Sequence, residues 1–123
     1  MASCYSTTKV ACLFLVIIYG LAVASLADKI EYTVPWNKPV ELLMFPAGKT
    51  FYPGDVLRFE YNPHTAAVYK VDIVGYNLCN IDQGTFLGDD GNTYYTIPTT
   101  GTFFFVSYPF QCLEGNALAI EVK

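Results

Sequence analysis

Few residues in this chain have side chains that could do chemistry. Its 123 residues contain one histidine, His64, and four cysteines. Two of those cysteines, Cys79 and Cys112, lie in the segments YNLC and FQCLEGN. A cysteine with imidazole neighbours is the pattern of a nucleophile or of a soft metal ligand. Two cysteines in an oxidising compartment instead form a disulfide. The compartment therefore decides which chemistry is expected.

Residues 1–27 have the pattern of a secretory signal peptide. A polar start with Lys9 precedes an apolar run at 10–24, and small residues end the segment at the predicted cleavage position, Ala27. The apolar run is shorter than the about 20 residues that a membrane-spanning helix needs. The sequence therefore predicts a secreted domain at 28–123, with no lipid-anchor signal at its C-terminal end.

Secretion bears directly on the cysteines. Cys4 and Cys12 belong to the predicted signal peptide, which leaves Cys79 and Cys112 in the mature domain. An even pair in a small secreted domain favours a disulfide, and closing this loop would stabilise the fold by about 3–4 kcal/mol. The alternative is that Cys112 serves as a metal-bound thiolate or a nucleophile. That role needs imidazoles nearby, and His64 is the only one in the sequence.

The remaining polar residues show no catalytic or metal-binding spacing. His64 lies in the turn YNPHTAA, where a lone histidine is typical of an exposed turn. Asp89 and Asp90 precede a glycine in GDDGNTY, which indicates a turn and lacks the glutamate of a calcium-binding EF-hand. Ser107 has no histidine partner. We therefore predict that the protein is not an enzyme, and its net charge of −4 argues against a nucleic-acid partner.

The elements that position these residues read as β-strands. Short runs rich in Val, Ile, Tyr, Phe and Thr alternate with turn residues, and this spacing predicts an all-β sandwich. The predicted strands are 29–34, 40–43, 56–61, 68–71, 94–97, 101–106 and 117–122. Residues 72–88 are less regular, and they are predicted as a helical turn or as a loop held by Cys79. The loop SYPF places Tyr108 and Phe110 either at the end of the core or on an exposed binding surface.

The sequence of residues 28–123 resembles the phytocyanins, the plant secreted branch of the cupredoxins. The resemblance is carried by YTV at 32–34, AGKTFYPGDVLRFEYNP at 47–63, YNLC at 76–79, IPTTGTFFFV at 97–106 and FQCLEGNALAIEV at 110–122. The segment 35–46 departs from the family, being shorter and having Phe45 where a tryptophan is typical. The resemblance implies a cupredoxin-like Greek-key β-sandwich with one disulfide, Cys79–Cys112, in agreement with the count of cysteines.

The resemblance also implies where the family's blue copper ligands would fall. The positions for a histidine, a cysteine, a second histidine and an axial methionine or glutamine are here Ala66, Val106, Gln111 and Asn116. None of the four is a competent ligand for a blue site, which needs a thiolate and two imidazoles. His64 lies two residues before the first position. The resemblance therefore implies a member without copper or another cofactor, similar to early nodulin-like and plantacyanin-like proteins.

These expectations combine into one functional hypothesis. The protein is expected to be a secreted, non-enzymatic binding or signalling module of the plant apoplast or cell wall. Its expected partner is an extracellular glycan, glycoprotein or receptor, with no span or anchor holding the mature chain in a membrane. The expected contact surface combines His64, Tyr108, Phe110 and Gln111. The alternative is a copper-binding electron carrier whose non-standard site uses His64, Gln111 and Asn116.

Overall fold

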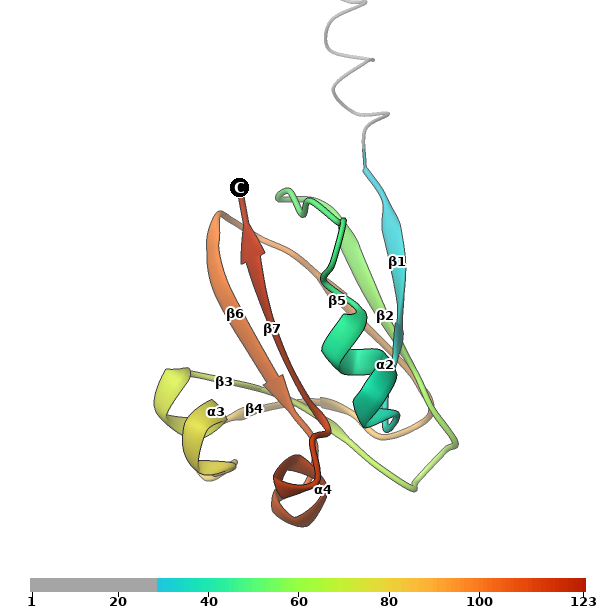
Figure 1. Cartoon of the computed structure of the whole chain (residues 1–123), viewed down its shortest axis with the longest axis vertical. Coiled ribbons are helices and arrows are strands. Elements are labelled where there is room, and N and C mark those ends of the chain that lie inside the picture. Colours follow the sequence, from blue (N-terminus) through green and yellow to red (C-terminus); the bar gives the residue numbers. More distant parts are fainter. Residues whose placement is uncertain (1–28) are drawn as a thin grey trace, which may run out of the picture.

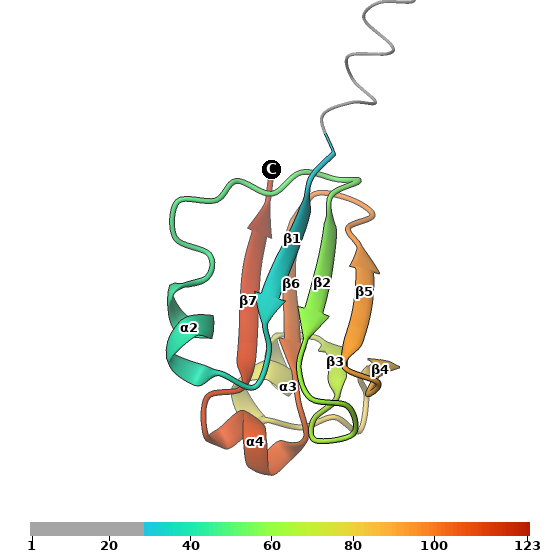
Figure 2. The same ribbon diagram turned by 90° about the vertical axis from the view of Figure 1, so that its right-hand side faces the viewer.

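The computed structural model of this protein describes residues 29–123, so the predicted signal peptide at 1–27 lies outside the described residues. Two β-sheets face each other across one core (Figures 1 and 2). No helix in the described part is long and apolar enough to cross a membrane. The all-β sandwich predicted from the sequence is therefore confirmed.

The first sheet has three strands in the order β1-β2-β5. They are β1 (Glu31–Pro35), β2 (Val56–Glu60) and β5 (Asn92–Thr96), with β1 parallel and β5 antiparallel to β2. The second sheet has the order β4-β3-β6-β7, with all neighbours antiparallel. Its strands are β3 (Val68–Val71), β4 (Thr85–Gly88), β6 (Gly101–Val106) and β7 (Ala117–Val122).

Alternating side chains of the two sheets form the core between them. Phe59 of β2 and Phe105 of β6 are both fully buried, and their ring centroids lie 5.1 Å apart. Trp36 packs edge-on against Phe59 at 5.0 Å, and its Nε1 donates a 2.7 Å hydrogen bond to the carbonyl of Ala67. This bond ties the end of β1 to the loop before β3, which contains one of the predicted copper positions.

Strand β6 has apolar side chains on both faces because both of its faces are covered. Phe103 and Phe105 point into the main core, whereas Phe104 and Val106 join a second cluster on the outer face of the same sheet. An interior strand with both faces covered needs no alternation of polar and apolar residues. Strand β6 is such an interior strand, because it pairs with β3 on one side and with β7 on the other.

The strand predicted at 40–43 is wrong, because this segment forms helix α2 (Pro39–Met44). Proline at the first helical position supplies a φ angle already suited to a helix and lacks only an N–H group that would be unpaired there. Leu42 is buried, while Val40 and Leu43 point to solvent. One buried residue per turn is a helical pattern, and the apolar composition alone concealed it.

The irregular segment 72–88 contains the predicted helical turn and a strand that was not predicted. Helix α3 (Ile73–Leu78) begins after Asp72, whose Oδ1 accepts a 2.8 Å hydrogen bond from the Gly75 amide. Strand β4 then pairs with β3 at the edge of the sheet. A four-residue edge strand ending in glycine carries little of the alternating pattern by which strands are recognised.

Candidate functional site

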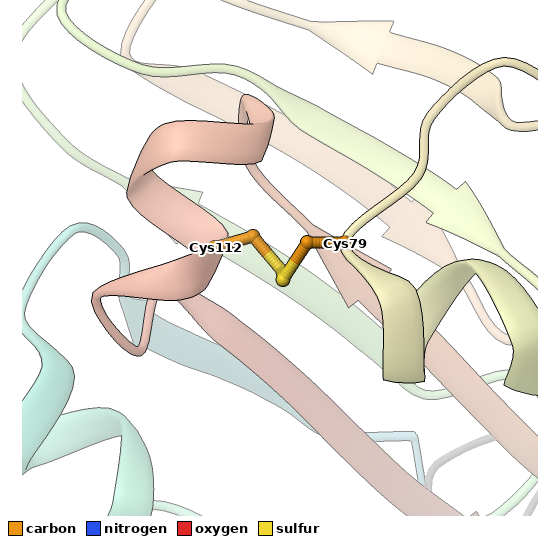
Figure 3. Close-up of a disulfide and its surroundings, with 2 residues drawn as sticks. All are labelled: Cys79 and Cys112. Atoms are coloured by element: carbon orange, nitrogen blue, oxygen red, sulfur yellow. A yellow bond between two sulfur atoms is a disulfide. The ribbon is translucent and has the colours of Figure 1, made fainter.

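Cys79 and Cys112 form a disulfide with an Sγ–Sγ distance of 2.05 Å and a Cα–Cα distance of 5.6 Å. Figure 3 shows that it joins the end of α3 to helix α4 (Pro109–Leu113). Cys79 adopts a left-handed conformation with φ 51°, which ends α3 and turns the chain. No free cysteine remains among residues 29–123. Cys112 is therefore a crosslink, and the thiolate role considered from the sequence is wrong.

The backbone gathers the predicted copper positions at one end of the sandwich. Val106 is the last residue of β6, and the amide of the next residue, Ser107, donates a 3.2 Å hydrogen bond to the carbonyl of Asn116. The amide of Asn116 donates to the carbonyl of Gln111 at 2.9 Å. Figure 1 shows this end as the one where α4 and the start of β7 lie. The backbone therefore keeps the predicted copper positions together, although the side chains at these positions differ from copper ligands.

The side chain of Gln111 is bound at both ends of its amide. Its Nε2 donates a 2.6 Å hydrogen bond to the carbonyl of Thr65, and its Oε1 accepts one from Ser107 Oγ. The fully buried Ser107 also accepts a 3.2 Å hydrogen bond from the Ala67 amide. We call these four residues, Thr65, Ala67, Ser107 and Gln111, the Gln111 clasp. It connects the loop before β3 to the segment that links β6 with α4.

Asn116 is also held by protein groups at both ends of its side chain. It is 1% exposed, and its Oδ1 accepts a 2.9 Å hydrogen bond from the Asn37 amide. Its Nδ2 lies 3.3 Å from Asn37 Oδ1, to which it donates. Asn37 has a positive φ of 64°, a conformation that asparagine tolerates better than most residues. The axial position therefore anchors the turn after β1.

These side chains do not fit a blue copper ion. Ala66 and Val106 are fully buried hydrocarbon groups, and neither has a donor atom. Gln111 and Asn116 have neutral amides already engaged with protein partners. Within residues 29–123, no three His, Cys, Asp or Glu side chains lie close enough to hold a metal ion. Copper favours soft thiolate and imidazole ligands, and neither is present at these four positions.

His64 directly precedes Thr65 of the clasp, but its imidazole has no hydrogen bond to a clasp residue among the described contacts. Its backbone has φ 61°, and its amide donates a 2.8 Å hydrogen bond to the carbonyl of Asp89. The imidazole Nδ1 is 3.7 Å from Asp89 Oδ2, and the side chain is 75% exposed. The sequence placed His64 beside Tyr108 and Gln111. The contacts place Thr65 against Gln111 and pair His64 with Asp89.

Three aromatic rings form a row on the outer face of the second sheet. Tyr69 lies between Phe86 and Tyr108, with centroid distances of 5.3 Å and 6.2 Å. Phe86 is 53% exposed and Tyr108 is 37% exposed. Burial raises the pKa of the Tyr69 phenol, and the neighbouring Tyr108 and Asp89 raise it further. We call Phe86, Tyr69 and Tyr108 the aromatic shelf.

Sequence reasoning identified only Tyr108 of the shelf, together with the nearby Phe110, which is 73% exposed. Tyr69 was assigned to a predicted strand, with no indication that its ring would face outward. Phe86 was missed because β4 was not predicted, so its pairing opposite Tyr69 was unknown. The signal that could have found the shelf is the apolar Phe86-Leu87 pair, which suggests a short edge strand.

An open hollow of about 580 Å³ lies beside the disulfide, between α2 and the end of α3. Its lining residues are Pro39, Val40, Leu43, Tyr76, Asn77, Cys79, Cys112, Gly115 and Ala117. Because both cysteines line the hollow, small reagents in solution have a route to the disulfide.

Comparison with known proteins gives a consistent result. The family model of the plastocyanin-like domain matches residues 36–116. Uclacyanin-2 of Arabidopsis thaliana is 33% identical over 99 residues, covering 79% of this chain and 48% of the relative. Early nodulin-like protein 22 of Arabidopsis thaliana is 29% identical over 87 residues, covering 70% of this chain and 62% of the relative. The chain thus spans about half the length of uclacyanin-2.

A solved structure extends the comparison to three dimensions. Cucumber basic protein, a blue copper protein, superposes with a TM-score of 0.64 at 27% sequence identity. The match covers 76% of this chain and 99% of the cucumber chain. The superposition therefore includes nearly all of the cucumber chain.

Proposed function

The chain belongs to the phytocyanin family of plastocyanin-like domains, and we propose that it is a copper-free member acting as a non-enzymatic binding module. We place it outside the cell, in the plant apoplast or cell wall, from the signal-peptide pattern at residues 1–27. The observation that carries the proposal is the state of the four copper positions. Two are buried hydrocarbon groups, and two are amides bound to other protein groups.

The rival function is electron transfer through a non-standard copper site, as favoured by the likeness to a blue copper protein. Such a site would use His64, Gln111 and Asn116. The Gln111 amide would have to leave Thr65 and Ser107, and Asn116 would have to leave Asn37. Exchanging these hydrogen bonds for a weakly binding oxygen donor is unfavourable, because the buried Ser107 and Asn116 side chains would lose their partners. A buried polar group without a partner costs about 1–3 kcal/mol.

The binding role is supported by exposed aromatic side chains at the end of the sandwich that carries the clasp. Tyr108 and Phe110 flank Pro109 at the start of α4, and Leu113 in the same helix is 76% exposed. Exposed apolar residues gathered in one place are typical of a contact surface. A rigid clasp below them would hold the surface in one shape, which lowers the entropy cost of binding. The candidate partners are an extracellular glycan, glycoprotein or receptor.

Replacing Tyr108 and Phe110 together with alanine is expected to weaken partner binding by about 10-fold or more, because aromatic anchors dominate contact surfaces. The measurement is binding of the purified protein to fractionated cell-wall glycans and secreted glycoproteins. The matched control replaces Tyr52 and Tyr94, which are 52% and 57% exposed, with alanine. Equal binding by the Tyr108/Phe110 variant and the wild type, with both variants folded, would remove this surface from the proposal.

A further inference from the structure

The aromatic shelf spans strands β3 and β4 and the residue that precedes α4. Tyr69 of β3 lies opposite Phe86 of β4 in the antiparallel pairing and opposite Val106 of β6 on its other side. Tyr108 is two residues beyond Val106, where it precedes α4. The three rings therefore lie side by side across the outer face of the sheet, with Tyr69 between Phe86 and Tyr108. Rings fixed by strand pairing lose little freedom when a ligand lies on them.

Helix α3 covers only part of this outer face. Its Tyr76 packs on Phe104 of β6 with a centroid distance of 5.0 Å, and the disulfide closes the cluster next to Val106. The shelf lies beyond this covered area, and Phe86 and Tyr108 remain substantially exposed. The edge of the area covered by α3 is therefore a boundary against which a ligand on the shelf could pack.

The carboxylate of Asp89 borders the shelf. Asp89 directly follows β4, which carries Phe86, and its charge acts on the Tyr69 phenol. The next residue, Asp90, is exposed. Among the described residues, the imidazole Nδ1 of His64 lies 3.7 Å from Asp89 Oδ2. The shelf thus combines electron-rich ring faces with negative charge.

The distribution of charge over the domain also favours a cationic ligand at the shelf. Lys29, Lys49 and Lys123 lie at the opposite end, where β1 begins and the backbone amide of Lys123 donates to the Phe51 carbonyl at 2.9 Å. The carboxylates at the shelf end are Glu60, Asp89, Asp90 and Glu114, with Lys38 among them. The opposite end also carries Glu31, Asp55 and Glu121, so its three lysines are matched by carboxylates. At the shelf end carboxylates outnumber cations even though Arg58 pairs with Glu60. This difference, added to a net charge of −4, directs cations toward the shelf.

We infer that the aromatic shelf and Asp89 bind a basic segment of another secreted polypeptide. In this arrangement an arginine side chain lies over the rings of Tyr69 and Tyr108 while its guanidinium pairs with the Asp89 carboxylate. Arginine suits both contacts, because its planar group stacks on aromatic rings and pairs with carboxylates. The inference rests on the proposed binding function and specifies the chemistry of its partner.

The test titrates a blocked tetra-arginine peptide into the isotope-labelled secreted protein, with a metal chelator in the buffer. We expect chemical-shift changes concentrated at Phe86, Tyr69, Tyr108 and Asp89, with affinity falling as salt is added. Asp89→Asn should raise the dissociation constant about 3-fold or more, as expected for one pair of opposite charges. The control Glu121→Gln removes an exposed carboxylate at the opposite end and should leave the dissociation constant unchanged.

A second variant separates ring stacking from folding. Tyr69→Leu keeps an apolar contact with Val106 but removes the ring face, and it should raise the dissociation constant about 2- to 5-fold in a protein that unfolds normally. Shift changes elsewhere, no binding, or equal effects of Asp89→Asn and Glu121→Gln would overturn the inference. Binding of neutral cello-oligosaccharides on the shelf in place of the peptide would also overturn it, while leaving the broader proposal of a binding module intact.

Discussion

Loss of the disulfide between Cys79 and Cys112 is expected to lower the free energy of unfolding by about 3–4 kcal/mol. The two cysteines are 33 residues apart in sequence, and an open chain of that length gains considerable entropy when the link is removed. The described part of the protein has one main core and a small outer cluster. A domain of this size has little stability in reserve, so the loss should be evident.

The measurement is denaturant-induced unfolding of the wild type and of a variant with both cysteines replaced by alanine. Reductant should destabilise the wild type by a similar amount, because the hollow beside α2 gives access to the disulfide. The same reductant should leave the double-alanine variant unchanged, which controls for effects elsewhere. A loss under 1 kcal/mol would mean that the link does not stabilise this fold.

Breaking the Gln111 clasp is expected to cost about 1–2 kcal/mol of stability. Gln111→Ala removes the acceptor of the buried Ser107 hydroxyl and the donor to the Thr65 carbonyl. Leaving a buried hydroxyl without its acceptor carries most of the cost, because Thr65 is exposed and its carbonyl can bind water. The measurement is again denaturant-induced unfolding. The control Gln83→Ala alters an exposed glutamine and should change stability by less than about 0.5 kcal/mol.

A second variant at the same position should make the stability contributed by the clasp depend on pH. In Gln111→Glu, the ionised carboxylate would face the Thr65 carbonyl, so the fold favours the protonated acid and raises its folded-state pKa. The stabilising contact should therefore be present below the unfolded pKa of about 4.3 and be lost as the pH rises through the folded value. A difference from the wild type that does not depend on pH, or Gln111→Ala stability equal to that of the wild type, would contradict the clasp.

The part of the fold that could be predicted is the part governed by local pattern. Strands β3, β6 and β7 have the predicted bounds, because runs of β-branched and aromatic residues there end at clear turn signals. The disulfide followed from the count of cysteines in a domain predicted to be secreted and from the family resemblance. The copper positions followed from the resemblance alone, since nothing in their residue types suggests a site.

The parts that could not be predicted depend on contacts between distant residues. Helix α2 was taken for a strand, because the buried side of a six-residue segment is known only once the rest of the core is in place. The clasp joins Gln111 directly to Thr65, 46 residues away in the sequence. It also joins Gln111 to Ala67 through Ser107, which the sequence analysis considered only as a serine without a histidine partner. The shelf required the pairing of Tyr69 with Phe86, which depends on the edge strand β4.

The central claim is that the four copper positions cannot hold a blue copper ion, and copper titration of the purified protein tests it most directly. Visible absorption is followed while free thiols are counted on the same sample. The positive control carries Ala66→His, Val106→Cys, Gln111→His and Asn116→Met, which restores the expected ligand set. We predict no thiolate-to-copper band, no free thiols and no copper retained against a chelator in the wild type, with the band appearing in the restored variant. An intense band or chelator-resistant copper in the wild type would contradict the account.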